Sequence, residues 1–206
     1  QYKSILKEVS NWANDVIGDD GKKVPMIFRP YHEFDGDWFW WGKSHCTIDE
    51  FKTLWRFTVT YLRDSLQVHN FIYAFSPDNT FATEEEYLER YPGNDYVDMV
   101  GMDNYGDFAS GAALGVTTAN SKLQMLSALG QSKVKVAAMT ETGRQITSTV
   151  TPVSGFFSTN IYNAMTSNNV KLAFVMFWGN SSSGYYVPPA GMTDTQDFKN
   201  FSLKEK

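Results

Sequence analysis

Short apolar runs alternate with helical patterns along the whole sequence, and this alternation constrains the fold more than any other feature. The apolar runs predict five strands, at residues 24–28, 71–75, 96–102, 134–139 and 172–177. Apolar spacings of three and four, together with capping signatures, predict helices around them, at residues 2–17, 47–66, 118–129, 158–166 and 193–201. Strands separated by helices indicate a parallel sheet of the α/β class.

Local signals refine these helices. Thr47 with Glu50, Thr83 with Glu86 and Thr193 with Gln196 each form a capping-box signature, and the second of these opens a short acidic helix. Trp12 and Trp55 fall on the apolar faces of the first two long helices, so we expect both in the core.

Two α/β architectures fit the pattern: an open doubly wound sheet and a (β/α)8 TIM barrel. The barrel is favoured because every strand ends in polar or aromatic residues, at 29–33, 76–79, 103–105, 140–144 and 178–180, and barrel enzymes draw one site from several strand ends. A barrel needs eight strands and about 250 residues. We therefore expect residues 1–206 to be the C-terminal five-strand portion of a single barrel, with about the first three βα units missing and an N-terminal barrel segment supplied from outside this chain.

Composition and missing motifs exclude several classes. Eighteen Lys and Arg against twenty-three Asp and Glu give a net charge of −5, so nucleic acid is a poor candidate partner. The single cysteine, Cys46, rules out an internal disulfide framework, and no apolar run approaches the roughly 18 residues of a membrane helix. The phosphate-loop spacing fails at residues 36–44, neither a Gly-x-Gly-x-x-Gly nor a Gly-x-Ser-x-Gly motif occurs, and His32, His45 and His69 lack a zinc-binding spacing.

Carboxylates at two strand ends are the main candidates for chemistry. Glu33 follows the strand at 24–28, and Glu141 follows the strand at 134–139. In a closed barrel both would stand on one rim, and two carboxyl groups about 5–5.5 Å apart are what retaining glycosidases use. A single strand-end glutamate is more often a surface or supporting carboxylate; two on separate strands, with aromatics beside them, favour catalysis.

Aromatic residues near these glutamates suggest a carbohydrate cleft. Trp38, Trp40 and Trp41 crowd the segment after Glu33, and Trp178 ends the last strand. Indole rings stack on the apolar faces of sugars, although core packing is an equal alternative for each. Tyr105 either hydrogen-bonds a neighbouring carboxylate or packs on the rim, and Asp78 and Asp103 are either structural caps or acceptors for sugar hydroxyls.

Four motifs, the first with tryptophans after it, together resemble glycoside hydrolase family 26, most members of which are endo-β-1,4-mannanases. They are Arg29-Pro30-Tyr31-His32-Glu33 with Trp38 and Trp41-Gly42, then Ser76-Pro77-Asp78, Met102-Asp103-Asn104-Tyr105-Gly106 and Thr140-Glu141-Thr142-Gly143. The resemblance covers strands four to eight of the family's barrel, and it implies a (β/α)8 fold and retaining hydrolysis without a metal or organic cofactor.

The resemblance also implies roles for single residues. Glu33 matches the acid/base and His32 the histidine before it; Glu141 matches the nucleophile, and Tyr105 the tyrosine that hydrogen-bonds it. Trp38 and Trp178 match the aromatics that flank the sugar at the cleavage point, and Asp78, Trp41 and Asp103 are further candidates for substrate binding. One departure is Gly179, which stands after Trp178 where the family often has a basic residue.

The expected function is a retaining endo-β-1,4-mannanase acting on mannan, glucomannan or galactomannan. The alternatives are another β-glycanase of the same family, acting on β-1,3-xylan or mixed-linkage glucan, and a non-catalytic carbohydrate-binding fragment. An unrelated α/β protein with coincidental glutamates is a third. Because polysaccharides lie outside cells, we expect a secreted or envelope-attached protein; because the chain begins at Gln1 and not at Met, we also expect a processed or excised piece whose targeting segment is out of view.

Overall fold

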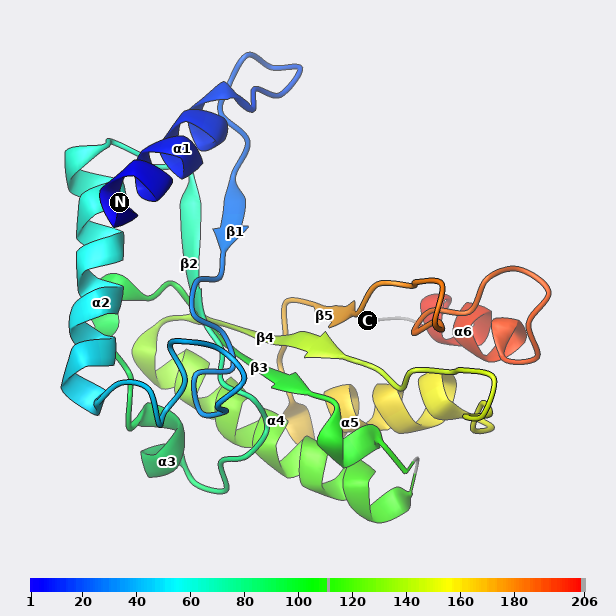
Figure 1. Cartoon of the computed structure of the whole chain (residues 1–206). Helices are drawn as coiled ribbons and strands as arrows, with labels where there is room; N and C mark the ends of the chain where they lie inside the picture. Colours follow the sequence, from blue (N-terminus) through cyan, green and yellow to red (C-terminus); the bar gives the residue numbers. More distant parts are fainter. Residues whose placement is uncertain (111, 205–206) are drawn as a thin grey trace. The chain divides into compact units, whose positions relative to one another are not determined.

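The computed structural model describes residues 1–110 and 112–204. The chain forms two compact units, Gln1–Val100 and Gly101–Lys206, and β3 (Met99–Asn104) begins in the first and ends in the second. Figure 1 shows the course of the chain through its helices and strands. Among the helices of the described residues, none is long and apolar enough to cross a membrane.

The first unit is a parallel sheet accompanied by helices. Its strands lie in the order β1-β2-β3, with Met26 of β1 opposite Phe71 of β2, and Ala74 of β2 opposite Met99 of β3. The elements in chain order are α1 (Tyr2–Asp15), β1 (Met26–Phe28), α2 (Ile48–Thr60) with a π-helical turn at Tyr61–Ser65, β2 (Phe71–Phe75), α3 (Glu84–Leu88) and a 3-10 turn at Asn94–Tyr96.

Helix α2 forms as its sequence predicts. The Thr47 side chain accepts the backbone N–H of Glu50, whose side chain accepts the backbone N–H of Thr47 in return, so the capping box is complete. Phe51, Trp55 and Val59, spaced by four, are fully buried. The Trp55 ring meets Phe75 of β2 edge-on at 5.6 Å between ring centroids. This apolar stripe fastens α2 to the sheet.

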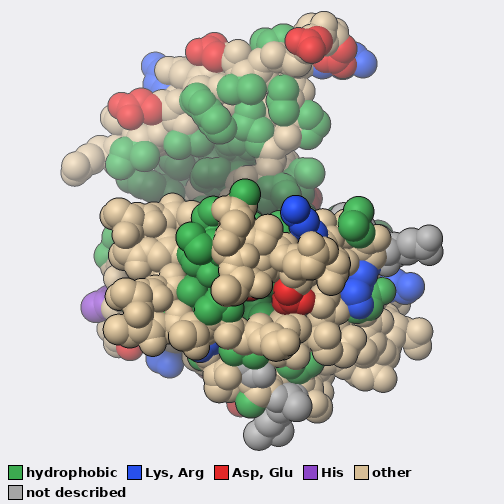
Figure 2. Space-filling model, turned by 90° about the vertical axis from the view of Figure 1, so that its right-hand side faces the viewer, with side chains coloured by type: hydrophobic (Ala, Val, Ile, Leu, Met, Phe, Trp, Pro, Cys, Tyr) green, Lys and Arg blue, Asp and Glu red, His purple; other side chains and the backbone are tan. Residues whose placement is uncertain are grey.

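Helix α1 leaves part of its apolar surface open. Leu6 and Ala13 are buried, but Trp12 is 60% exposed, so the expectation of a core position for Trp12 is wrong. The reason is that Trp12 lies beside the buried stripe of the helix and not within it. Ile5, Ile17 and Ile27 are also exposed, and Figure 2 shows hydrophobic side chains open to solvent around α1 and β1.

The second unit continues the sheet and adds a helical layer. Its strands lie in the order β3-β4-β5, and β4 runs parallel to β5 with Met139 opposite Val175. The elements after β3 are a 3-10 turn at Gly106–Phe108, α4 (Ala113–Lys133), β4 (Val136–Thr142), a π-helical turn at Phe156–Ile161, α5 (Tyr162–Thr166), a 3-10 turn at Ser167–Asn169, β5 (Val175–Phe177) and α6 (Thr195–Ser202). An aromatic cluster of Phe157, Phe177 and Phe198 joins α6 to β5.

The ends of β3 and β4 and the start of α6 differ from their predicted positions. Strands β3 and β4 extend beyond the predicted ends at 102 and 139, so that Asp103 and Glu141 lie inside strands. Polar side chains there are buried and hydrogen-bonded, and a hydrophobicity pattern reads them as loop. The cap of α6 is Asp194, not Thr193, and its side chain makes no capping hydrogen bond.

Candidate active site

Glu33 lies in a tight turn after β1 that the neighbouring strand end holds in place. Glu33 and Tyr31 both adopt left-handed backbone angles, with φ of 53° and 51°, a conformation that is costly for residues other than glycine. The backbone N–H of Glu33 donates to the carbonyl of Ser76 at 2.9 Å. The Trp38 indole N–H donates to Glu33 Oε2 at 2.6 Å. Glu33 is therefore held both at its backbone N–H and at its carboxyl group.

The side chain of Tyr31 holds the same turn in place. Its side chain is buried, and its hydroxyl forms a cluster with the hydroxyls of Tyr2 and Thr58, the latter at 2.7 Å from Tyr31. Burial raises the pKa of Tyr31 above its ordinary value, so the phenol stays protonated. This hydroxyl cluster ties the turn to α1 and α2.

The aromatic residues after Glu33 divide into exposed and supporting ones. Trp38 is 57% exposed and presents a ring face beside Glu33. Trp41 is half-buried: its indole N–H donates to the carbonyl of His32 at 2.8 Å, and its ring stacks on Phe39 at 4.4 Å. Trp38 is thus placed to contact a ligand, while Trp41 holds the backbone at His32.

Asp35 joins the Glu33 turn to the loop after β2, and sequence reasoning missed it. Its carboxylate accepts the backbone N–H of Asp78 at 2.7 Å and the hydroxyl of Thr80 at 2.5 Å. Burial is the main influence on Asp35 and raises its pKa above the ordinary value. An aspartate two residues after the candidate Glu33, before Gly36, was the signal available in the sequence.

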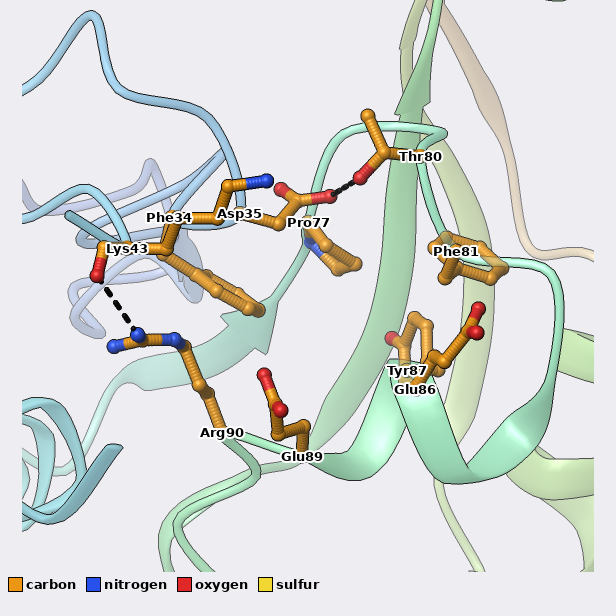
Figure 3. A pocket seen from close by; sticks show the side chains of 10 residues that line it. All are labelled: Phe34, Asp35, Lys43, Pro77, Thr80, Phe81, Glu86, Tyr87, Glu89 and Arg90. Atoms are coloured by element: carbon orange, nitrogen blue, oxygen red, sulfur yellow. Dashed lines mark hydrogen bonds between the residues drawn. The ribbon is translucent and has the colours of Figure 1, made fainter. Parts of the chain in front are cut away.

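Figure 3 shows a cavity of about 180 Å³ beside this loop junction. Asp35 and Thr80 are joined on one of its walls, and Arg90 reaches the carbonyl of Lys43 on another. Arg90 is 6% exposed and also donates to the carbonyls of Cys46 and Thr47, so its guanidinium closes the loop before α2. These hydrogen bonds of Asp35 and Arg90 hold the loop after β2 and the loop before α2 in place.

Glu141 lies near the end of β4 and is held by Tyr105. The Tyr105 hydroxyl donates to Glu141 Oε2 at 2.8 Å, and Glu141 is 3% exposed. Burial, and then the hydrogen bond to Glu141, raise the pKa of Tyr105. The phenol is therefore the donor and the carboxylate the acceptor. This bond fixes the orientation of the Glu141 side chain.

Side chains on either side of Glu141 fasten β4 to β3. Thr140 donates its hydroxyl to Asp103 Oδ1 at 2.7 Å, and Thr142 donates to the carbonyl of Asn104 at 2.7 Å. Asp103 and Asn104 are fully buried. This geometry favours the structural reading of Asp103 over the reading as an acceptor for sugar hydroxyls.

Trp178 follows β5 and offers a ring face. Its backbone N–H donates to the carbonyl of Thr142 at 3.2 Å, which places Trp178 beside the end of β4, and the residue is 48% exposed. Tyr186, later in the same loop, meets Tyr105 at 5.9 Å between ring centroids with the planes at 67°. Sequence reasoning missed Tyr186; the tyrosine pair in a polar loop after Trp178 was its only signal.

The predicted site residues thus form two groups, one in each unit. The first unit brings together Glu33, His32, Trp38, Trp41 and, through Asp35, Asp78. The second unit brings together Glu141, Tyr105 and Asp103, with Trp178 at the adjoining strand end. Each group centres on one carboxylate with a hydrogen-bond donor and an exposed indole nearby.

The chain is similar in sequence to curated proteins. The chain is 36% identical, over 219 aligned residues, to a mannan endo-1,4-beta-mannosidase of Bifidobacterium adolescentis, covering 100% of this chain and 22% of that protein. It is 34% identical to a mannan endo-1,4-beta-mannosidase of Bacillus subtilis over 51% of this chain and 33% of that protein. The chain therefore spans a third or less of these two curated relatives.

Solved structures match across both units. GH26C from Muricauda sp. matches 98% of this chain and 55% of its own, with 50% identity and a TM-score of 0.96. An endo-beta-1,4-mannanase from Cellulomonas fimi matches 98% of this chain and 46% of its own, with 31% identity and a TM-score of 0.92. The expected fold class, α/β with the parallel strands of a (β/α)8 barrel, is confirmed by these matches. The model of glycosyl hydrolase family 26 matches residues 1–178, and the chain therefore belongs to glycosyl hydrolase family 26.

Proposed function

We propose that the protein is a retaining endo-β-1,4-mannanase that hydrolyses mannan, glucomannan or galactomannan by double displacement. The relatives named above, mannan endo-1,4-beta-mannosidases, support the substrate. The observation that carries the mechanism is the hydrogen bond of 2.8 Å from the Tyr105 hydroxyl to Glu141 Oε2. A nucleophilic carboxylate must be oriented and kept ionised, and a neutral phenol that donates to it serves both needs.

In the first step, Glu141 attacks the anomeric carbon of the sugar while Glu33 donates its proton to the leaving glycosidic oxygen. A covalent glycosyl-enzyme forms, and the shortened chain departs. In the second step, Glu33 takes a proton from a water molecule, which attacks the same carbon and releases Glu141. Trp38, which holds Glu33 Oε2 through its N–H, keeps the acid/base in place across both steps.

Substrate binding is proposed for the exposed aromatics and for His32. Trp38 and Trp178, 57% and 48% exposed, provide faces for sugar rings. His32 is held by Trp41 through its backbone carbonyl. Trp41 and Asp103 are proposed to act through their neighbours, Trp41 on His32 and Asp103 on Thr140 beside Glu141. Asp78 is also proposed to bind substrate. Its backbone N–H donates to Asp35, and this bond fixes the loop after β2 that carries Asp78.

Two further proposals concern the surroundings of the chain. We propose that residues 1–206 are one portion of a single catalytic barrel, and that strands from outside this chain complete it. Support comes from the open apolar surface of α1 and β1 and from the coverage of about half of each solved relative. We also propose a secreted or envelope-attached location, because the polymeric substrate lies outside cells.

The roles of the two glutamates predict different losses. Glu141→Ala removes the nucleophile, so hydrolysis of mannan and of aryl mannosides should fall to background. Glu33→Ala removes the proton donor, worth about 10²- to 10⁴-fold on mannan, and should lose much less on an aryl mannoside whose leaving group needs no proton. Steady-state kinetics on both substrates measures the difference. Glu85→Ala, an exposed glutamate of α3, is the matched control.

The roles of the two glutamates and the identity of the substrate are tested by separate measurements. Equal and complete losses in Glu33→Ala and Glu141→Ala on the aryl mannoside would contradict the assigned roles. Reducing-sugar release should be measured on galactomannan, glucomannan, β-1,3-xylan and mixed-linkage glucan. Release from the last two alone would replace mannan as the substrate while leaving the roles of both glutamates intact.

A further inference from the structure

Tyr186 stands beside the Glu141 end of β4 although it is 45 positions away in the sequence. Its ring meets Tyr105, the hydrogen-bond donor to Glu141, in an edge contact with centroids 5.9 Å apart. The ring also covers Gly143, two residues after Glu141: a Cβ at Gly143 would lie 2.8 Å from Tyr186 Cδ1. Tyr186 therefore borders the nucleophile site directly.

The position of Tyr186 is built into its loop. The Asn180 side-chain oxygen accepts the backbone N–H groups of Tyr186 and Val187 at 2.9 and 3.0 Å, and its amide donates to the carbonyl of Val187 at 2.7 Å. On the other side, Tyr185 pairs with Ile146 through two backbone hydrogen bonds of 2.8 and 3.0 Å. The loop is held at both neighbours of Tyr186, so the placement of the ring is determined.

The Tyr186 hydroxyl has no protein partner within the described residues, since only its backbone N–H takes part in hydrogen bonds there. The side chain is partly exposed. Burial, followed by the negative charge of Glu141, raises the pKa of Tyr186, so the phenol is neutral at working pH and retains its proton for donation. A fixed ring with an unpaired donor at the edge of a site is suited to bind a hydroxyl of a ligand.

We propose that Tyr186 is a substrate-binding residue that contacts the sugar unit attacked by Glu141, through a hydrogen bond from its hydroxyl and contact with its ring. The inference rests on the proposed function and deepens it. Glu141 forms its covalent bond to the glycone sugar, so a residue bordering Glu141 lies beside that unit. Tyr186 belongs to the loop that begins with Trp178 and Gly179. Gly179 is the position at which the family often has a basic residue.

Three variants test the proposal. Tyr186→Phe keeps the ring and removes the hydroxyl; Tyr186→Ala removes both. Tyr185→Phe is the matched control, because the neighbouring hydroxyl donates to Asp194 at 3.0 Å instead of facing the Glu141 site. Kinetics on manno-oligosaccharides should show kcat/KM reduced about five- to tenfold in Tyr186→Phe, the value of one hydrogen bond. A larger loss is expected in Tyr186→Ala, since contact surface is removed as well.

A binding measurement separates recognition from stability. Calorimetric titration with manno-oligosaccharide, in a Glu33→Ala background that slows turnover about 10²- to 10⁴-fold, should show Kd raised by a similar factor in Tyr186→Phe, with Tm unchanged. Tyr185→Phe should leave Kd unchanged. If Tyr186→Phe keeps both Kd and kcat/KM, and only Tyr186→Ala loses activity together with Tm, Tyr186 is a packing residue and the proposal is overturned while the proposed function stands. If the unaltered protein neither binds nor cleaves any mannan, the proposed function fails and the Tyr186 proposal fails with it.

Discussion

At the scale of single residues, the two candidate carboxylates are held in different ways. Glu33 occupies a left-handed turn and is bonded by an exposed indole, whereas Glu141 is buried in a strand and bonded by a phenol. A proton donor that serves the leaving group needs access to substrate and water, and a nucleophile needs a fixed direction of attack. The two environments match the two proposed roles.

Gly143, two residues after Glu141, has a backbone that a side chain would strain. Its φ of +135° disfavours any side chain, and a Cβ there would press on the Tyr186 ring at 2.8 Å. Gly143→Ala should therefore cost about 1–3 kcal/mol of unfolding free energy and lower kcat/KM by displacing Tyr186. Chemical denaturation and mannan kinetics measure the two effects.

The control for this change is Gly179→Ala, where no atom lies within 4 Å of the added Cβ and the backbone angle is unremarkable for other residues. It should leave unfolding free energy and activity nearly unaltered. Equal behaviour of the two alanine variants would show that the contact between Gly143 and Tyr186 carries neither strain nor function.

Asp35 predicts a dependence of stability on pH. Burial raises its pKa in the folded protein above the ordinary value of 3.8, so the folded state binds this proton more tightly than the unfolded state. Its contribution to unfolding free energy is then greatest at low pH and declines as pH rises from 3.8 through the raised pKa. Asp35→Asn cannot titrate, so its unfolding free energy should decline less across that window.

A second variant checks the cause. The Thr80 hydroxyl lowers the pKa of Asp35, so Thr80→Val should extend the decline to higher pH. Urea denaturation at a series of pH values gives the curves. If the unfolding free energies of Asp35→Asn and of the unaltered protein differ by the same amount at every pH, Asp35 does not titrate in this range.

Which site residues the sequence could predict follows from how each is positioned. Glu33, Glu141 and Tyr105 could be proposed from the sequence because each follows a predicted apolar strand and lies in a recognisable motif. Asp35 and Tyr186 are not, since their importance depends on contacts with Asp78, Thr80 and Gly143 that are distant in sequence. Trp12 shows the opposite error, because a helical pattern does not say how wide the buried stripe is.

At the scale of elements, the side-chain caps of α2 and α3 were predictable, whereas the cap of α6 and the ends of β3 and β4 were not. Thr47 and Thr83 cap α2 and α3 as expected, because a cap is formed by residues three apart. The last residues of β3 and β4 fall outside the predicted strands because their polar side chains are hydrogen-bonded across the sheet, as Thr140 is to Asp103. Cross-strand pairing of this kind leaves no periodic signal in one strand's sequence.

The capping box of α2 gives an element-scale prediction. Thr47→Ala removes the side chain that accepts the Glu50 N–H and should lower unfolding free energy by about 1 kcal/mol. Thr53→Ala, at an exposed position within the same helix, removes no cap and should be neutral or slightly stabilising. Thermal or urea denaturation compares them. A loss in Thr53→Ala as large as in Thr47→Ala would assign the effect to threonine itself and not to the cap.

At the scale of the whole molecule, the family match and the structural matches extend over both compact units, although each unit has its own carboxylate group. The order of motifs along the chain was therefore a stronger predictor than any one motif. Five parallel strands with polar ends predicted the fold class, and the regions of the solved relatives beyond the matched half could not be inferred from this chain.

The open surface of the first unit leads to a prediction for the 206-residue chain studied alone. Within the described residues, β1 pairs with β2 along one edge only, and Ile27 on β1 is 47% exposed. Ile5, Trp12 and Ile17 of the same unit are exposed as well. An unprotected strand edge beside apolar side chains favours association. Light scattering should show the isolated chain forming dimers or larger species, and Ile27→Lys should reduce them. Leu203→Lys, at an isolated position 81% exposed, adds the same charge and should not. A monomeric chain, or equal effects of both lysines, would show that the β1 edge needs no covering.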